Sequence, residues 1–374
     1  MKGNEPVAPI LVRSKTYHWP GIDADPQYKY SRGANPTRSQ LEDALIKNEC
    51  YKGDLHAAAF GSGIAAEAAF FMGLSPGDRV LLCDEIYGGT YRLFNLILKR
   101  LGIECDFADF NDYAGARKKI TRRTKYIFVE PISNPSLVVT DMNNVARLSR
   151  ETGVPFAVDG TFCPAPAFKA FEWGAEAVIY SLSKYFSGHN DSLGGAVLTR
   201  NKKVFESVKL MQSTLGAVLS PDECYRIIQG MKSLDIRWKH VSASAATVAG
   251  WIWSHEKVER ALYPGLTSHL RHESACAQFK HGCGSVVSFE LKTKDRAKVK
   301  RFVDAIIADK KIVFGESLAS PETILAYPAI MSHRSLPARQ RLSLGITDGF
   351  FRLSLGFDDP QEIIRSLDKA LARI

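Results

Sequence analysis

Short apolar segments alternate with longer helical patterns between about residue 48 and residue 235. The predicted strands are Ala57–Phe60, Val80–Cys83, Glu104–Phe107, Tyr126–Glu130, Phe156–Asp159, Ala177–Ser181 and Gly195–Thr199. Helical segments such as Tyr91–Leu101 and Met142–Thr152 lie between them. This alternation predicts an α/β fold with a mostly parallel central sheet and helices on both faces. Such sheets bind ligands at the carboxyl ends of their strands.

The two ends of the chain follow other patterns. Proline and glycine interrupt any periodicity in the first 45 residues or so, which predicts an extended arm over residues 1–47. A helix-rich passage from about Glu223 to Glu259 leads into a second lobe. The elements predicted there are the strands Gly284–Leu291 and Gly349–Gly356 and the helices Ala297–Ala308 and Pro360–Ile374. We therefore expect an α/β domain over residues 48–235 and a smaller α+β domain over residues 236–374.

Composition narrows the class of protein. Of the 374 residues, 45% are hydrophobic and 24% charged, as in ordinary globular proteins, and no apolar run approaches the length of a membrane helix. The first residues lack the pattern of a signal peptide, so we expect a cytoplasmic protein. The net charge of +9 is spread along the chain, which argues against nucleic-acid binding. Seven dispersed cysteines and no HExxH pattern predict reduced thiols and no metal site.

The first candidate for chemistry is SLSKYFSGHND, residues 181–191, directly after the predicted strand Ala177–Ser181. A lysine in this place, Lys184, suits a Schiff base with an aldehyde, while its hydroxyl neighbours can bind a phosphate. A lysine in a surface loop is the alternative.

Two further motifs lie upstream of Lys184. In FAVDGTF, residues 156–162, Asp159 ends a buried strand and could pair with a protonated pyridine nitrogen; capping a helix or loop is the alternative. In AFGSGIAAEAAF, residues 59–70, Gly63 and Ile64 open an alanine-rich helix whose N–H groups would favour a phosphate. A simple tight turn explains that pattern as well.

A fourth motif is DEIYGGTYRLF, residues 84–94. Tyr87 follows a predicted strand and could stack on a cofactor ring and act as a phenolic acid or base; ordinary packing is the alternative. These motifs occur in one order along the chain, and that order is more specific than any one of them.

The motifs together resemble the pyridoxal-5′-phosphate (PLP)-dependent enzymes of Cys/Met metabolism, which include cystathionine γ-lyase, cystathionine γ-synthase and methionine γ-lyase. The resemblance extends from about Pro9 to Phe357. Besides the motifs already quoted, it is carried by YKYSRGANPTRSQLE (28–42), EPISNP (130–135), LSPDECYRIIQGMKSLDIR (219–237), ESL (316–318) and FFRLSLGFDD (350–359). It implies PLP fold type I, similar to aspartate aminotransferase.

The resemblance also implies a cofactor site. Lys184 is similar to the lysine that carries PLP, Asp159 to the partner of the ring nitrogen and Tyr87 to the residue that stacks on the ring. The residues that match the phosphate site are Gly63, Ile64, Ser181 and Ser183, with Tyr30 and Arg32 reaching the phosphate of a neighbouring subunit. A dimer would then be the minimum functional unit, and the family is usually a homotetramer.

On the substrate side, Arg352 matches the arginine that binds the α-carboxylate, for which a planar guanidinium is suited. Asn134 would bind near the cofactor and this carboxylate, and Ser317 would support the lysine or the carboxylate. Arg92 could attract an anionic leaving group or a polar distal arm. Tyr327 stands in a segment that departs from the family pattern and could narrow the pocket.

The departures are Gly160 in place of the usual asparagine, Ser317-Leu318-Ala319-Ser320 in place of S-L-G-G, Ala326-Tyr327-Pro328-Ala329 in place of S-H-P-A, and Lys29. They favour a specialised substrate. We therefore expect γ-elimination on an L-amino acid with a γ-leaving group. The alternatives are γ-replacement, as in cystathionine γ-synthase or O-acyl-homoserine sulfhydrylase, an ordinary cystathionine γ-lyase, and a PLP-binding protein without turnover. The leaving group stays open.

Overall fold

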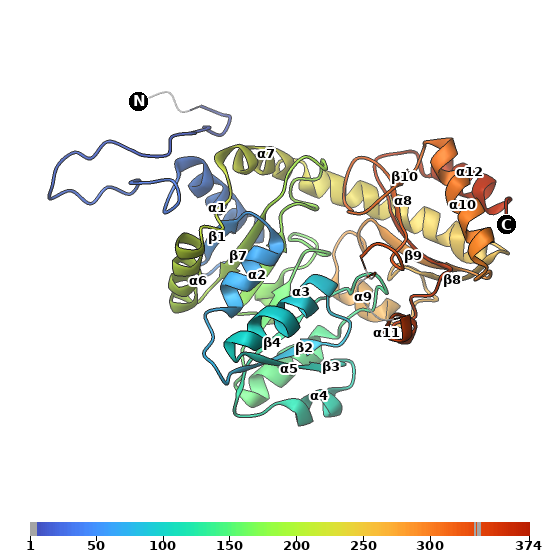
Figure 1. The fold of residues 1–374 in the computed structure, drawn as a ribbon, viewed down its shortest axis with the longest axis horizontal. Coiled ribbons are helices and arrows are strands. Elements are labelled where there is room, and N and C mark those ends of the chain that lie inside the picture. Colours follow the sequence, from blue (N-terminus) through green and yellow to red (C-terminus); the bar gives the residue numbers. More distant parts are fainter. Residues whose placement is uncertain (1–5, 333, 335–337) are drawn as a thin grey trace.

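The computed structural model describes residues 6–332, 334 and 338–374 (Figure 1). Its strands are β1 His56–Phe60, β2 Arg79–Cys83, β3 Glu104–Ala108, β4 Thr124–Val129, β5 Phe156–Asp159, β6 Ala177–Ser181, β7 Gly195–Thr199, β8 Val258–Leu262, β9 Val286–Leu291, β10 Val313–Phe314, β11 Ile324–Ala326 and β12 Phe350–Ser354.

Helices occupy most of the chain between the strands. The α-helices are α1 Pro36–Glu49, α2 Gly63–Phe71, α3 Gly88–Arg92, α4 Tyr113–Lys119, α5 Met142–Thr152, α6 Lys202–Leu215, α7 Pro221–Met231, α8 Leu234–Ser254, α9 His272–Gln278, α10 Arg296–Asp309, α11 Ala338–Ser343 and α12 Pro360–Leu371. A π-helical turn at Leu93–Ile97 and 3₁₀ turns at Leu98–Leu101 and Ala170–Trp173 complete the set.

The larger sheet has seven strands in the order β1-β7-β6-β5-β4-β2-β3. Strands β6, β5, β4, β2 and β3 are parallel, and β7 pairs antiparallel with both β1 and β6. Gly195 begins β7 directly beside the start of α2, where a side chain would overlap the Ser62 carbonyl oxygen. The absence of a Cβ at this position therefore brings the N-terminus of α2 against the sheet.

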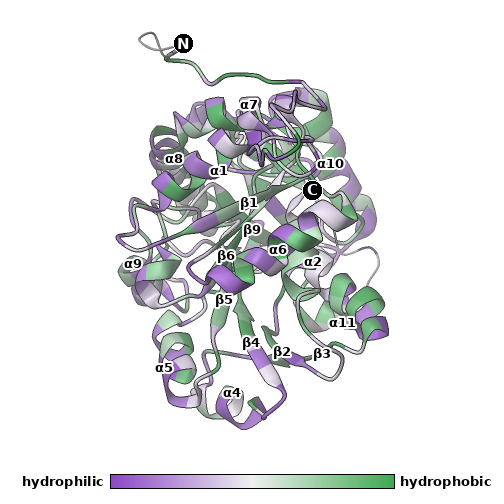
Figure 2. Ribbon diagram, turned by 90° about the vertical axis from the view of Figure 1, so that its left-hand side faces the viewer, coloured by the Kyte–Doolittle hydropathy of each residue, from purple (hydrophilic) through white to green (hydrophobic). Residues whose placement is uncertain are grey.

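Helices cover both faces of this sheet, as the alternating pattern predicted (Figure 1). Helix α2 packs on β6 and β7, α6 on β1 and α5 on β5. Between them the core is rich in aromatic rings, with Phe71 contacting Phe94 at 4.8 Å and Phe128 at 5.0 Å between ring centroids. Figure 2 shows hydrophilic residues on outer helices such as α4 and α5, and hydrophobic residues along the central strands.

The second sheet has five strands in the order β10-β11-β12-β9-β8, and all its pairs except β10–β11 are antiparallel. Helices α10 and α12 pack on each other, and the 21-residue α8 contacts both α12 and this sheet. Asp295 and Asp359 cap α10 and α12 by accepting backbone N–H groups, as aspartates do at helix starts. The domain boundaries given above stay a prediction.

Many element boundaries differ from those predicted by one to three residues. The helix predicted over Tyr91–Leu101 begins at Gly88 and changes to π-helical and 3₁₀ turns after Arg92. The two glycines at its start have low helix propensity and concealed it in the sequence. Strand β4 ends at Val129 rather than Glu130, and the last helix ends at Leu371 rather than Ile374.

Residues 6–35 are largely extended and project from the body of the protein (Figure 1), whereas residues 36–47, predicted as part of the same arm, lie in helix α1. Thr16 and Tyr30 form an isolated antiparallel bridge within the extended part. Near its base, the Val12 N–H donates to Thr37 Oγ1 at 2.8 Å, and Arg13 pairs with Asp222 at 2.6 Å. Among the described residues, no helix combines the length and the apolar character that a membrane crossing requires.

Candidate active site

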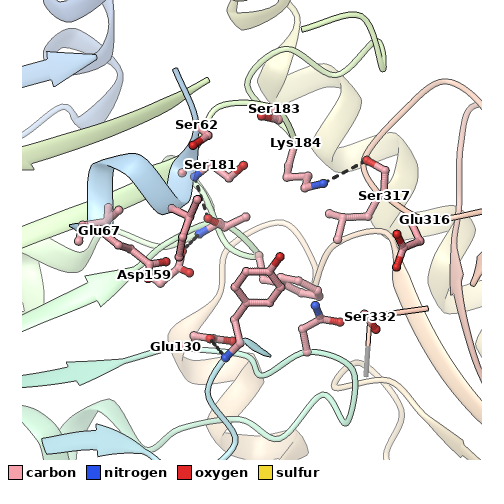
Figure 3. A pocket seen from close by; sticks show the side chains of 18 of the residues that line it. Ser62, Glu67, Glu130, Asp159, Ser181, Ser183, Lys184, Glu316, Ser317 and Ser332 are labelled. Carbon is pink, nitrogen blue, oxygen red and sulfur yellow. Dashed lines mark hydrogen bonds between the residues drawn. The ribbon is translucent and has the colours of Figure 1, made fainter. Parts of the chain in front are cut away.

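A cavity of about 790 Å³ opens where the carboxyl ends of β4, β5 and β6 face the second lobe (Figure 3). Its wall brings together most of the residues singled out in the sequence. These are Gly63, Ile64, Tyr87, Arg92, Asn134, Asp159, Ser181, Ser183, Lys184, Ser317 and Arg352. Segments more than 250 residues apart in the chain, from α2 to β12, therefore meet at the sheet edge where parallel sheets bind ligands.

Lys184 lies in the loop after β6 and points across the cavity (Figure 3). Its Nζ donates to Ser317 Oγ at 3.1 Å. Burial, and next the positive charge of Arg352, lower the pKa of Lys184 to about 8, against the opposing effect of Glu316. The amine is therefore a better nucleophile and base at neutral pH than an exposed lysine.

One end of the cavity favours an anion. Helix α2 begins there at Gly63, and Ser62 caps it by accepting the Ala65 N–H at 3.2 Å. A Cβ on Gly63 would lie 2.9 Å from Ser181 Cβ, so the helix start is in close contact with the end of β6. The first N–H groups of a helix have no intrahelical acceptor and attract phosphate. Ser183, by contrast, uses its hydroxyl to accept the Gly194 N–H at 2.9 Å.

Another part of the cavity wall is acidic. Asp159 ends β5, and its Oδ1 accepts the Thr161 N–H at 2.9 Å. Two carboxyls that the sequence analysis did not single out, Glu67 and Glu130, also line the cavity. Burial raises the pKa of all three, and the Asp159 charge raises those of Glu67 and Glu130 further. A signal for both was present in the sequence, because Glu67 is the one acidic residue of an alanine-rich helix and Glu130 begins the EPISNP motif.

The side of the cavity formed by the second lobe is built around Arg352. This buried residue of β12 donates through Nη1 to Asn134 Oδ1 at 2.9 Å and through Nη2 to the Ser317 carbonyl at 2.7 Å. Its Nε is buried and has no hydrogen-bond partner among the described residues. Burial lowers the pKa of Arg352 to about 10, and the group stays a cation at neutral pH. A carboxylate entering the cavity would meet this charge.

Three predicted site residues do not line this cavity. Tyr30 is exposed at the base of the arm, and Arg32 donates to the Ser213 carbonyl at 2.6 Å. The Tyr327 ring stacks on Phe351 at 5.0 Å, and its hydroxyl donates to the Asp348 carbonyl at 2.9 Å. The structure thus places Tyr327 in the core of the second lobe.

Other residues of the cavity wall were given no role in the sequence analysis, although Glu316 and Leu318 stand in the ESL motif. Glu316, Leu318, Met331 and Arg334 come from the second lobe, and Leu193 comes from the loop before β7. Their places depend on how the two sheets meet, which no local pattern encodes.

Comparison with known proteins identifies the family. The profile of the Cys/Met metabolism PLP-dependent enzymes matches residues 2–372. The chain belongs to this family. It is 37% identical over 365 residues to cystathionine gamma-lyase of Bacillus subtilis (strain 168), covering 97% of this chain and 94% of that one. It is 36% identical over 367 residues to cystathionine beta-lyase of Coxiella burnetii (strain RSA 493 / Nine Mile phase I), covering 98% and 92%.

Solved structures of the family agree. Cystathionine gamma-lyase from Lactobacillus plantarum, complexed with L-serine, gives a TM-score of 0.91 at 32% identity, covering 98% of this chain and 93% of that one. Cystathionine gamma synthase from Xanthomonas oryzae pv. oryzae, in complex with cystathionine, gives 0.92 at 32% identity with the same coverage. The predicted family, fold type I and PLP dependence are confirmed, and the chain is an enzyme that acts on an amino acid.

Proposed function

We propose that this enzyme catalyses γ-elimination on an L-amino acid that carries a leaving group at Cγ. The observation that carries the proposal is the placement of Lys184. Its amine has a pKa lowered to about 8 and lies 3.1 Å from Ser317 Oγ. The carbonyl of the same Ser317 accepts a hydrogen bond from Arg352, the arginine suited to an α-carboxylate. The net reaction takes up one water and releases the leaving group, ammonia and a 2-oxo acid.

The cavity wall carries residues suited to the ring nitrogen of PLP and residues suited to its phosphate. Asp159 would pair with the ring nitrogen, and the N–H groups of Gly63 and Ile64, with Ser181 and Ser183, would hold the phosphate. Tyr87 would stack on the ring. When bound, PLP supplies an aldehyde for the substrate amine and a ring that withdraws electrons from Cα. The helix start, the buried carboxyls and the lysine all line this one cavity, which supports the proposal.

The side chains then divide the work. Arg352 binds the α-carboxylate, with Asn134 beside it, and fixes which Cα bond is broken. The Lys184 amine would take the proton from Cα, release it again and, once more neutral, take one from Cβ. The pKa of the Tyr87 hydroxyl is raised, mainly by burial, so Tyr87 keeps its proton at neutral pH and can donate it to the leaving group.

Arg92 supports γ chemistry on a polar or anionic distal group, because it lines the cavity at the end of α3. The relatives include both gamma-lyases and beta-lyases, which break bonds one carbon apart. γ-Replacement, as named for the Xanthomonas oryzae enzyme, is the second candidate. It differs only in whether a nucleophile or a proton adds at Cγ. The departures around Leu318 and Ala319, which are buried beside the cavity, support a specialised substrate.

A substrate panel tests the reaction. Cystathionine, methionine, O-acyl-L-homoserines and γ-halogenated amino acids are each supplied with and without a thiol. γ-Elimination gives 2-oxobutanoate, β-elimination of cystathionine gives pyruvate, and replacement consumes the thiol without ammonia. Pyruvate as the main product would contradict the γ assignment. Turnover of cystathionine at a kcat/KM of about 10⁴ M⁻¹s⁻¹ or more would contradict a specialised substrate.

Borohydride reduction tests the cofactor lysine. It should fix a phosphopyridoxyl group on the peptide that contains Lys184, and Lys184→Ala should leave that peptide unlabelled. Label on another lysine would overturn the assignment.

We also propose that the working unit is at least a dimer, as part of a homotetramer in the cytoplasm, with Tyr30 and Arg32 completing the phosphate site of a neighbouring subunit. Both lie outside the cavity of their own chain. Apolar groups near the cavity are partly exposed, Ile64 and Tyr87 by 38% each and Leu193 by 68%, as a subunit interface would require.

Mixed dimers test the shared site. Arg32→Ala chains and Lys184→Ala chains, each inactive or weakened alone, should regain activity when mixed because one hybrid site keeps both residues. Verified mixed dimers without recovery would contradict the shared site.

A further inference from the structure

Three buried carboxyls line the cavity, and the chain gives each a different partner (Figure 3). Asp159 accepts the Thr161 N–H, and Glu130 accepts the Tyr87 N–H at 2.6 Å. Glu67, from α2, accepts the hydroxyl of Thr90 at 2.7 Å. The Thr90 side chain is fully buried on α3, and Glu67 is only 3% exposed. The proposed cofactor contact uses Asp159 alone and leaves Glu67 without a role.

The three carboxyls do not carry charge equally. The side chain and backbone of Thr161 both stabilise ionised Asp159 by hydrogen bonding, whereas the donor to Glu67 is the single hydroxyl of Thr90. After burial, the Asp159 charge is the main cause that raises the pKa of Glu67. Asp159 therefore ionises first, and its charge keeps a proton on Glu67.

The surroundings of Glu67 offer little compensation. The strands β6 and β7 and the helix α6, which pack on α2, contribute no charged side chain to the described cavity wall. From α3 and the residue before it come Arg92, Thr90 and the neutral phenol of Tyr87. The cationic side chains of Lys184 and Arg352 also line the cavity, but their hydrogen bonds go to other residues. Lys184 donates to Ser317, and Arg352 donates to Ser317 and Asn134.

We propose that Glu67 is a positioning residue that acts as a neutral acid. One of its oxygens accepts the Thr90 hydroxyl, and its own O–H is directed to Asp159, so that Asp159 is held in place and is the only anion facing the ring nitrogen. Figure 3 shows the Glu67 and Asp159 side chains next to each other in the cavity wall. The inference rests on the proposed place of Asp159 in PLP binding.

Two variants separate a neutral acid from an anion and from a space filler. Glu67→Gln keeps an N–H donor for Asp159 and an oxygen for Thr90. We expect its PLP dissociation constant at pH 7.5 to stay within about twofold of wild type. Glu67→Leu keeps the neutrality but removes the donor. Because a hydrogen bond to a charged group is lost, we expect PLP to bind about tenfold more weakly or worse. Thr90→Val is the matched control for the hydroxyl that Glu67→Leu leaves without its acceptor.

A second readout is the pH dependence of the absorbance of bound PLP. In Glu67→Leu, Asp159 lacks the Glu67 donor and stabilises the positive charge on the ring nitrogen less well. We therefore expect the pH midpoint of the absorbance change to be higher in Glu67→Leu than in wild type. Glu67→Gln should have the same midpoint as wild type. A purely structural role for Glu67 would not move this midpoint.

The outcomes decide the matter either way. A tenfold loss of PLP affinity in Glu67→Gln would mean that Glu67 acts as an anion and would overturn the proposal. The same follows if Glu67→Leu matches Thr90→Val in both readouts, because Glu67 would then only fill space. If Glu67→Leu does not fold, the PLP affinity of Glu67→Gln alone still tells whether Glu67 acts as an anion or as a neutral acid. A failure of the proposed function would look different, because it would be seen in the wild-type enzyme. Borohydride would then label a lysine other than Lys184, or the substrate panel would give pyruvate in place of 2-oxobutanoate.

Discussion

A carboxyl far from the cavity mouth makes the stability of this enzyme depend on pH. Glu49 ends α1 and is buried, with its Oε1 accepting the Tyr180 hydroxyl at 2.7 Å. Its other oxygen is buried without a hydrogen-bond partner among the described residues. Burial raises the pKa of Glu49 from 4.5 to about 7, although the Tyr180 hydrogen bond and the charge of Lys169 oppose the rise.

The sign of the effect follows from this direction. Since the folded-state pKa lies above the unfolded value, the contribution of Glu49 to stability is full below pH 4.5 and is lost as the pH rises through about 7. At about 1.4 kcal/mol for each pH unit between the two values, the loss amounts to about 3 kcal/mol.

Glu49→Gln removes the charge and keeps an oxygen for Tyr180. We expect the variant to match wild type near pH 4.5 and to exceed it by about 3 kcal/mol in unfolding free energy at pH 8. Urea denaturation of the PLP-loaded protein at both pH values measures this difference. Glu259→Gln, an exposed change on β8, controls for the loss of one carboxylate. Tyr180→Phe should enlarge the loss in wild type, because it removes a hydrogen bond that holds the pKa down.

The reasoning would be refuted if Glu49→Gln and wild type differed by the same amount at both pH values. That result would mean that Glu49 ionises in the folded protein as readily as in water.

Other predictions concern the site and its supports. The rate at which PLP attaches to the apoprotein should rise with pH to a midpoint near 8, and Glu316→Gln should lower that midpoint because its charge holds the pKa of Lys184 up; an unmoved midpoint would count against this. Tyr327→Phe should cost about 1 kcal/mol of unfolding free energy and leave substrate preference unchanged, and a changed preference would mean that Tyr327 reaches the substrate. Gly195→Ala should weaken PLP binding at least tenfold, measured by equilibrium dialysis, because the added methyl displaces the start of α2; unchanged binding would show that α2 can adjust.

Local patterns in the sequence predicted most of the larger sheet and the center of the site. Asp159 and Ser181 end short apolar strands, and parallel strands end at the same edge, so the order of the motifs was enough to bring them together with Lys184. The helix start at Gly63 follows from the same rule, since a glycine-bracketed turn after a strand leads directly to the sheet edge.

The remainder depends on contacts between distant parts of the chain. Tyr327 was placed near the substrate from its neighbours in sequence, yet its ring packs inward on Phe351. An acidic residue in a helix usually faces solvent, and only the packing of α2 on the sheet turns Glu67 to the cavity. The roles proposed for Tyr30 and Arg32 require a second chain, which one sequence does not position.

Ser317 links the two lobes at a single residue. It accepts from Lys184, which follows the larger sheet, and from Arg352, which belongs to the smaller one. Its backbone is in the left-handed region, with φ at 93°, a conformation that favours glycine over other replacements. With the roles proposed for Lys184 and Arg352, laboratory evolution that varies this position alone would change cofactor attachment and carboxylate binding together. Libraries intended to alter substrate choice should therefore keep Ser317 fixed and vary residues that touch only one of these two groups.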